Sequence, residues 1–377
     1  MATFQDHMFS LILDVDNATS VNETAAPVKF KPTTEGRAVA YSALLIMAVL
    51  PIIYGSFCSV DHLKKQKKKH KESGEMPETL SKSDAMWFPV IASFTLGGLY
   101  LVIKIFSQEY VNYLLSIYFF FLGIFALTRL VCRITDRTPS FLMKRVNYHL
   151  LFTKKEPKDT RPEAIIDFKY STLDILAFIL SALFGVWYVY KKHWIANNIF
   201  GIAFACSGIE FLSLNRIMNG CILLGGLFFY DVFWVFYTDV MVTVAQSFDA
   251  PIKLMFPQDL LENGFYGKHH AMLGLGDIVV PGIFIALLLR YDVSLKKRGY
   301  TYFYTSLIAY FLGLVLTVFI MTVFNHAQPA LLYLVPACIL SPLSVAFLKG
   351  DLKTMFKYED HKEDIKPVEN KKAKKVN

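Results

Sequence analysis

Long apolar segments dominate this chain of 377 residues and leave few folds open to it. Hydrophobic residues make up 54% of the sequence and charged residues only 19%, with a mean hydropathy of +0.39. A run of about 20 apolar residues is long enough to cross the hydrocarbon core of a bilayer as a helix. Because such runs recur along the chain, we expect an all-α polytopic membrane protein with polar ends.

Nine apolar segments have the length of a transmembrane helix. Only three residues, 325–327, separate the last two segments, so eight spans with a re-entrant loop is the alternative count. The expected spans are 38–60, 87–106, 110–132, 172–190, 193–214, 217–244, 271–290, 300–324 and 328–348.

These spans predict five regions with different compositions. They are an N-terminal tail at 1–37, a three-helix bundle at 38–132, a hydrophilic loop at 133–171, a six-helix region at 172–348 and a Lys-rich tail at 349–377. Most of the 39 Lys and Arg residues fall in segments that share one side of the membrane. The positive-inside rule therefore predicts a lumenal N-terminus and a cytosolic C-terminus. The net charge of +8 is then a topology signal and gives no reason to expect nucleic acid as a partner.

Both tails carry short signals that agree with this orientation. Asn17 and Asn22 begin the two Asn-X-Ser/Thr sequons, and both lie in the expected lumenal tail. Lys374 and Lys375, at the fourth and third positions counted from the C-terminus, resemble a dilysine signal for retrieval to the endoplasmic reticulum. We therefore expect a glycosylated multi-pass protein of the endoplasmic-reticulum membrane.

Two aspartates, Asp231 and Asp277, lie inside consecutive apolar spans. Placing a charged carboxylate at the centre of a membrane helix costs about 3 kcal/mol or more, so such a residue is a functional-site hypothesis by default. On antiparallel neighbouring helices the two could face each other at similar depth. Two carboxyl groups that share one proton form the pair that aspartic proteases use.

The residues around the aspartates predict an irregular backbone. Gly274 and Gly276 lack side chains and weaken a helix, and Pro281 removes the amide that would bond back to the carbonyl of Asp277. Pro329, near the start of the last span, predicts a distorted helix there as well. Tyr230, next to Asp231, is either a hydrogen-bond donor at the site or an aromatic packing residue.

Four other polar residues within or beside the spans read as structural. Glu210 is expected to form a structural hydrogen bond inside its span. His193, Asn197 and Asn198 are expected to anchor a helix at the membrane interface or to join neighbouring helices.

Three motifs in a fixed order resemble the signature of presenilin-type intramembrane aspartyl proteases. They are Tyr230-Asp231, Gly274-Leu275-Gly276-Asp277 and Pro329-Ala330-Leu331, on successive late spans. Within that family the chain is most similar to the signal peptide peptidases, and the similarity extends over roughly residues 36–350.

The resemblance implies a presenilin-like fold and an aspartic endopeptidase with Asp231 and Asp277 as catalytic residues. Pro329, Ala330 and Leu331 would shape the site and hold an unwound substrate strand. The implied substrates are signal-peptide remnants and other type II transmembrane segments, with no cofactor and no metal. Homo-oligomerisation, contact with membrane lipid and membership of an endoplasmic-reticulum degradation complex are further partners that it leaves open.

Two other functions remain as alternatives. A cation-coupled transporter or channel could use the two carboxylates as ion ligands, and flux without peptide cleavage would favour it. A noncatalytic scaffold in membrane-protein quality control would keep its biological role after Asp277→Ala.

Overall fold

The computed structural model describes residues 33–73, 79–136, 146–154, 163–238, 240–248, 250–267, 269–295, 299–324 and 328–360. Its contacts divide the chain into two compact units, Met1–Ala40 with Pro257–Ala271, and Tyr41–Phe256 with Met272–Asn377. The sequons at Asn17 and Asn22 and the lysines Lys374 and Lys375 lie outside the described residues. Their expected roles stay predictions.

The first unit is small. It holds the short helix α9 (Leu260–Asn263), the 3-10 turn η1 (Gly264–Tyr266) and the beginning of α2 (Thr34–Ser73). The amide of Gln258 donates to the carbonyl of His269 at 2.7 Å. A Cβ atom on Gly36 would lie 2.1 Å from the carbonyl oxygen of Gln258, so only glycine fits at this point of α2.

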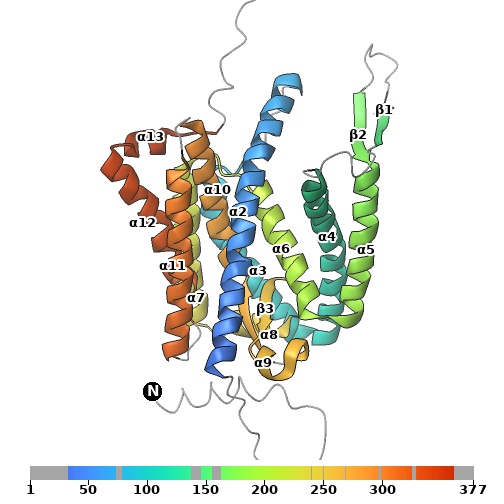
Figure 1. Ribbon diagram of the computed structural model, residues 1–377, viewed down its shortest axis with the longest axis vertical. Coiled ribbons are helices and arrows are strands. Elements are labelled where there is room, and N and C mark those ends of the chain that lie inside the picture. Colours follow the sequence, from blue (N-terminus) through green and yellow to red (C-terminus); the bar gives the residue numbers. More distant parts are fainter. Residues whose placement is uncertain are drawn as a thin grey trace, which may run out of the picture. The chain divides into compact units, whose positions relative to one another are not determined.

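The second unit holds the rest of α2 and the other long helices (Figure 1). In chain order they are α3 (Lys82–Ile105), α4 (Gln108–Asp136), α5 (Thr172–Lys191), α6 (Trp194–Phe211), α7 (Ile217–Phe236), α8 (Val240–Ser247), α10 (Gly276–Ser294), α11 (Thr301–Phe324), α12 (Leu331–Lys349) and α13 (Leu352–Lys357). Two strand pairs complete the fold: β1 (Asn147–Lys154) with β2 (Glu163–Ser171), and β3 (Lys253–Pro257) with β4 (His270–Gly274).

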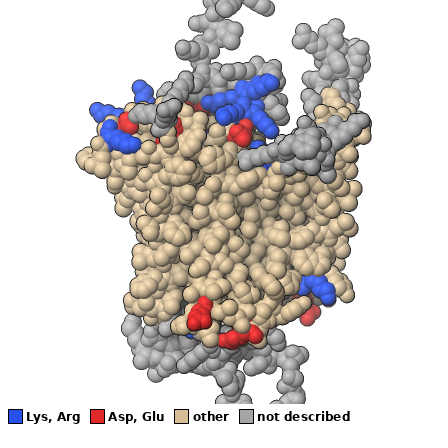
Figure 2. Space-filling model, viewed as in Figure 1, with Lys and Arg blue, Asp and Glu red and all other residues tan. Residues whose placement is uncertain are grey.

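Seven of the described helices are long and apolar enough to cross a membrane, namely α2, α3, α4, α5, α7, α11 and α12. The space-filling view agrees, because a broad band without charged side chains covers the visible face (Figure 2). Lys and Arg gather around the C-terminal end of α2 and around α13. The multi-pass membrane nature of the chain is thus confirmed. The two other helices at expected spans, α6 and α10, contain buried charged residues, and the count of nine stays a prediction.

Helix α10 is the centre of the second unit (Figure 1). It contacts α6, α7, α11 and α12, and every residue from Ile283 to Asp292 is buried. A helix that is enclosed on all sides needs no amphipathic pattern, because protein takes the place of solvent or lipid around it. This enclosure explains how α10 can carry polar residues inside a membrane protein.

Glycines let the neighbouring helices approach α10 closely. A Cβ atom on Gly220 of α7 would lie 2.6 Å from a ring carbon of Phe284. On α10 itself, a Cβ atom on Gly282 would lie 2.6 Å from Cδ1 of Ile209 in α6. Close backbone approach at small residues is a usual way for membrane helices to associate.

Two expected spans differ from the helices that form. The segment 217–244 was expected to be one helix, but α7 ends at Phe236 and a separate helix α8 begins at Val240. The polar residues Thr238 and Asp239 follow α7 and interrupt the apolar run. The segment 271–290 does not begin as a helix either, because residues 270–274 form strand β4.

The predicted hydrophilic loop at 133–171 contains regular structure that the sequence analysis missed. Strands β1 and β2 pair antiparallel in it, with an irregularity between Phe152 and Thr153. Both strands contain aromatic and β-branched residues, which favour strands. The charged residues of both strands made the whole segment look like a hydrophilic loop in the sequence.

Glu210 is the centre of a buried ionic cluster between α2, α4 and α6. Its Oε1 lies 3.2 Å from Nη2 of Arg129, is bonded to Arg133 and lies 3.6 Å from Nδ1 of His62. Only 6% of the Glu210 side chain is exposed. The contacts of Glu210 therefore fit the expected structural role, because they join three helices through one ionic cluster.

We predict that Glu210→Gln destabilises the protein by about 3 kcal/mol, because two arginines would lose the charge that compensates them in a largely buried place. Thermal unfolding in detergent measures the loss. The matched control is Glu359→Gln, which breaks the ion pair with the exposed Arg216. That change should cost about 1 kcal/mol or less. Equal losses for the two variants would contradict the structural role of the cluster.

Candidate active site

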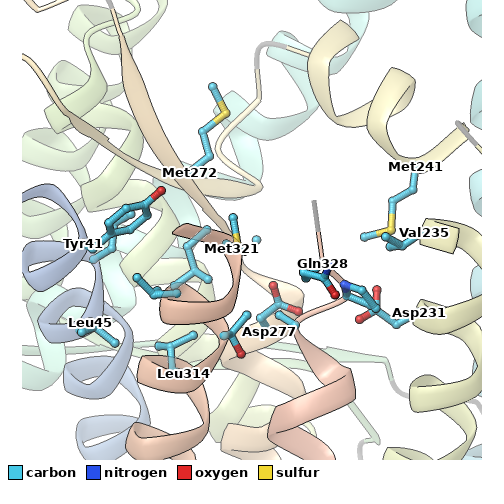
Figure 3. Close-up of a pocket in the computed structure, with 17 residues that line it drawn as sticks. Tyr41, Leu45, Asp231, Val235, Met241, Met272, Asp277, Leu314, Met321 and Gln328 are labelled. Atoms are coloured by element: carbon cyan, nitrogen blue, oxygen red, sulfur yellow. The ribbon is translucent and has the colours of Figure 1, made fainter. Parts of the chain in front are cut away.

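A pocket of about 170 Å³ in the second unit contains both Asp231 and Asp277 (Figure 3). Its wall is built by α2, α7, α8, β4, α10, α11 and the residues just before α12. The apolar part of the wall includes Leu45, Leu314 and Met321. The arrangement places two carboxyl groups in a small and mostly apolar cavity.

Asp231 lies near the end of α7, and 3% of its surface is exposed. Its Oδ2 accepts a hydrogen bond from the backbone amide of Leu331 at 3.0 Å. Leu331 is the first residue of α12, where the amides have no partner within the helix. This hydrogen bond thus ties the start of α12 to Asp231, which lies 100 positions earlier in the chain.

Asp277 lies in the first turn of α10, after the end of strand β4. A Cβ atom on Gly274 would lie 3.4 Å from Oδ2 of Asp277, which shows how close the backbone before the helix comes to the carboxyl group. The expected irregular approach to this helix is therefore present as a strand. Asp277 was expected inside a span that begins at residue 271, but it lies in the first turn of α10.

The carboxyl groups of the two aspartates come from different helices and point toward a common space (Figure 3). Gln328 lies beside them, just before the Pro329-Ala330-Leu331 motif. Two facing carboxyl groups can bind one water molecule between them and share one proton.

Some residues of the three motifs line the pocket and others do not. Gly274, Pro329 and Ala330 line it with the two aspartates. Tyr230 does not line it, and its ring packs on Trp234 with the centroids 6.4 Å apart. Leu331 contributes its backbone amide, which donates to the carboxyl group of Asp231.

The remaining motif residues have local roles at the start of α10. The amide of Leu275 donates to the carbonyl of Ile252 at 3.0 Å, which fixes the turn before α10. A Cβ atom on Gly276 would meet nothing within 4 Å.

Several lining residues were not predicted from the sequence. Leu314, Thr317 and Met321 of α11 line the pocket at helical spacing, but apolar residues and a single Thr on an apolar span give no signal of their own. Gln328 offered a signal, because it is a polar residue directly before Pro329 and the apolar segment that follows.

Of the two expected roles, a contact between helices is present at Asn198, whose Nδ2 lies 3.7 Å from Sδ of Met47 in α2. The shorter bonds of Asn197 and Asn198 go to a strand. Nδ2 of Asn197 donates to the carbonyl of Lys253 at 2.7 Å. Asn198 donates to the carbonyl of Met255 at 2.6 Å and accepts from its amide at 2.8 Å. Both side chains of α6 therefore bind the backbone of strand β3.

Comparisons with known proteins identify the family of this chain. A family model described as signal peptide peptidase matches residues 71–362. The signal peptide peptidase of Mus musculus is 54% identical over 94% of this chain and 92% of its own length. The one of Homo sapiens is 56% identical over 90% of this chain and 87% of its own length. The chain belongs to the signal peptide peptidase family.

More distant relatives carry related names. Intramembrane protease 2 of Caenorhabditis elegans is 41% identical over 62% of this chain and 56% of its own length. The solved structure of a presenilin family intramembrane aspartate protease covers 81% of this chain and 99% of that chain, at 14% identity and a TM-score of 0.48. That likeness is too weak to carry an argument. Membership of the signal peptide peptidase family confirms the expected enzyme class, an aspartic endopeptidase that cleaves within the membrane.

We predict that Ala330→Leu lowers the cleavage of a transmembrane peptide at least about tenfold, because a misplaced substrate loses much of its rate. The larger side chain would enter the pocket beside the aspartates, while the amide of Leu331 would still reach Asp231. Cleavage by purified protein in detergent gives the measurement. Ser344→Leu, on the exposed side of the same helix, is the control and should leave cleavage unchanged. Full activity of Ala330→Leu would contradict a substrate-binding role for this pocket.

Proposed function

We propose that Asp231 and Asp277 are the catalytic pair of this family member and that they cut type II transmembrane segments, signal-peptide remnants among them. The observation that carries the proposal is the meeting of two carboxyl groups, from α7 and α10, in one small apolar pocket. Neither carboxyl group has a cationic partner among the described ion pairs, in contrast to Glu210. Such a pair is suited to acid–base chemistry on a bound water.

In the proposed mechanism one aspartate is ionised and takes a proton from the water, which attacks the carbonyl carbon of the scissile peptide bond. The other aspartate is protonated and donates to the carbonyl oxygen. Collapse of the tetrahedral intermediate breaks the C–N bond, and the first aspartate delivers the proton taken from water to the leaving nitrogen. The second aspartate recovers its proton from a hydroxyl group of the intermediate, which becomes the new carboxylic acid. The two groups titrate as one pair, and either can begin as the acid.

The substrate has to unwind before it is cut, because a peptide bond within a helix is shielded by its own turns. Free backbone groups are tolerated at membrane depth only where protein or water satisfies them. Strand β4 and the two residues Gln328 and Pro329, shortly before α12, bring non-helical backbone to the pocket. We assign to the Pro329-Ala330-Leu331 motif the shaping of the site and the holding of the unwound peptide.

The proposal includes an orientation and a location. Nine spans in a presenilin-like arrangement, with a lumenal N-terminus and a cytosolic C-terminus, would fit the bias of Lys and Arg along the sequence. The lysines Lys374 and Lys375 support residence in the endoplasmic-reticulum membrane. A scaffold role in a degradation complex, or a homo-oligomer, would be compatible with the same site, whereas ion transport would require a different use of the carboxyl groups.

The decisive test compares the natural chain with Asp231→Asn and Asp277→Asn. We expect each variant to lose cleavage of a signal-peptide-like substrate by about a hundredfold to ten-thousandfold, because each removes a proton donor or acceptor of the reaction. Purified proteins in detergent and mass spectrometry of the products give the measurement. Thermal unfolding shows whether each variant remains folded.

The outcomes separate the candidate functions. Loss of cleavage in both folded variants supports the dyad and argues against a transporter. Equal cleavage by all three chains would assign the activity to another site. If the natural chain cleaves none of several substrates in several lipids, the noncatalytic scaffold becomes the better-supported function.

The orientation predicts glycans at Asn17 and Asn22. When the chain is made in endoplasmic-reticulum membranes, Asn17→Gln and Asn22→Gln should each remove one glycan, and the double variant should remove all. Migration on a gel before and after glycosidase treatment gives the count. A sequon inserted after Lys357 is the control and should stay unmodified; a glycan at that position would overturn the orientation.

A further inference from the structure

The side chain of Asn198 binds strand β3 as a neighbouring strand would. It donates to the carbonyl of Met255 at 2.6 Å and accepts from the amide of the same residue at 2.8 Å. Asn197 adds a bond from its Nδ2 to the carbonyl of Lys253 at 2.7 Å. Both asparagines are buried, with 3% and 4% of their surfaces exposed.

These bonds satisfy the edge of β3 that faces away from β4. Backbone groups of alternate residues in a strand point to opposite sides. The carbonyl of Ile252 points to the β4 side, where it accepts from the amide of Leu275. The carbonyls of Lys253 and Met255 point to the opposite side and accept from the asparagines of α6. Without the asparagines, buried backbone groups of β3 would lose their partners, and the strand would have to shift to find new ones.

The strand held by the asparagines leads directly to Asp277. Leu275, which is bonded to Ile252, precedes Asp277 by two residues. On α6, one turn after Asn197, a Cβ atom on Gly201 would lie 2.8 Å from Leu254 and 3.5 Å from Leu275. Helix α6, strand β3 and the turn before α10 are therefore packed without space between them.

We propose that Asn198, assisted by Asn197, is a positioning residue that sets the place of the β3–β4 pair and thereby of Asp277 relative to the scissile bond. The inference rests on the proposed catalytic role of Asp277. Asn198 itself is not among the residues that line the pocket. Its effect on the reaction passes through the backbone of β3 and the bond between Ile252 and Leu275.

The test uses three alanine variants of the full chain, purified in detergent with a synthetic transmembrane peptide as substrate. Asn198→Ala removes two bonds to β3 and Asn197→Ala removes one. Asn219→Ala is the matched control, because Asn219 is also buried and donates to one backbone carbonyl, that of Leu80, at 3.3 Å. The readouts are kcat, KM, the bonds cut, found by mass spectrometry, and the thermal unfolding midpoint.

We expect Asn198→Ala to lower kcat about tenfold to a hundredfold, since a displacement of 1 Å at a reacting group can cost that much. KM should change little, because the pocket wall is intact, and the distribution of cut bonds should move along the peptide. Asn197→Ala should shift both readouts in the same direction by less. Asn219→Ala should cut the same bonds as the natural chain with the same kcat.

The inference is overturned if folded Asn198→Ala cuts the same bonds with unchanged kcat, or if its kcat falls no more than that of Asn219→Ala. Should Asn198→Ala fail to fold, the milder Asn197→Ala decides by the same readouts. Asp277→Asn is measured alongside. If Asp277→Asn is inactive and Asn198→Ala is unaffected, only this inference is overturned. If Asp277→Asn is active, the proposed function itself is overturned.

Discussion

The enclosure of α10 by protein is the constraint on which the rest of the structure depends. A polar or charged residue at membrane depth is tolerable only where other protein groups or water surround it. Helix α10 meets this condition because α6, α7, α11 and α12 pack around it, and Gly220 and Gly282 permit the close approach. The same packing leaves one cavity at the first turn of α10, where Asp277 lies. The fold thus provides both the shelter for a carboxyl group and the space in front of it.

The two ends of α10 use polar residues in opposite ways. Near the C-terminal end, Arg290 donates to Ser59 and to the carbonyl of Leu214 and is paired with Asp360 at 3.1 Å, and Asp292 accepts from the amide of Phe303. Each of these groups is bonded to a partner on another segment, which ties that end of the helix to its surroundings. At the N-terminal end, Asp277 faces a second carboxyl group across a cavity. A carboxyl group facing a like group can take up or release a proton in a way that an ion-paired residue cannot, which is why the chemistry is assigned to this end.

Hydropathy and the apolar context of two aspartates predicted much of this arrangement, and long-range contacts explain what they missed. Each expected span coincides with a helix over most of its length, because an apolar run in a membrane protein has few other ways to satisfy its backbone. The contact of Leu331 with Asp231 joins positions 100 residues apart and has no local pattern. Strand β4 was missed because its residues continue an apolar run into α10, and only pairing with β3 distinguishes them. The bonds of Asn198 to strand β3 were missed for a similar reason, since its partner Met255 is 57 positions away.

The two aspartates are held by separate parts of the fold, and this separation bears on how the pair is regulated. Asp231 is carried by α7 and is bonded to the first amide of α12, whereas Asp277 follows the strands that α6 holds through its asparagines. The geometry between the carboxyl groups therefore depends on how α12 and α6 are placed around α10, and neither helix contributes a carboxyl group. A change at either helix can alter the distance between the two acids while leaving both of them, and the pocket wall around them, chemically unchanged. A peptide that unwinds beside β4 and α12, as proposed, would contact these same two supports, so we expect binding of substrate to change the alignment of the two acids.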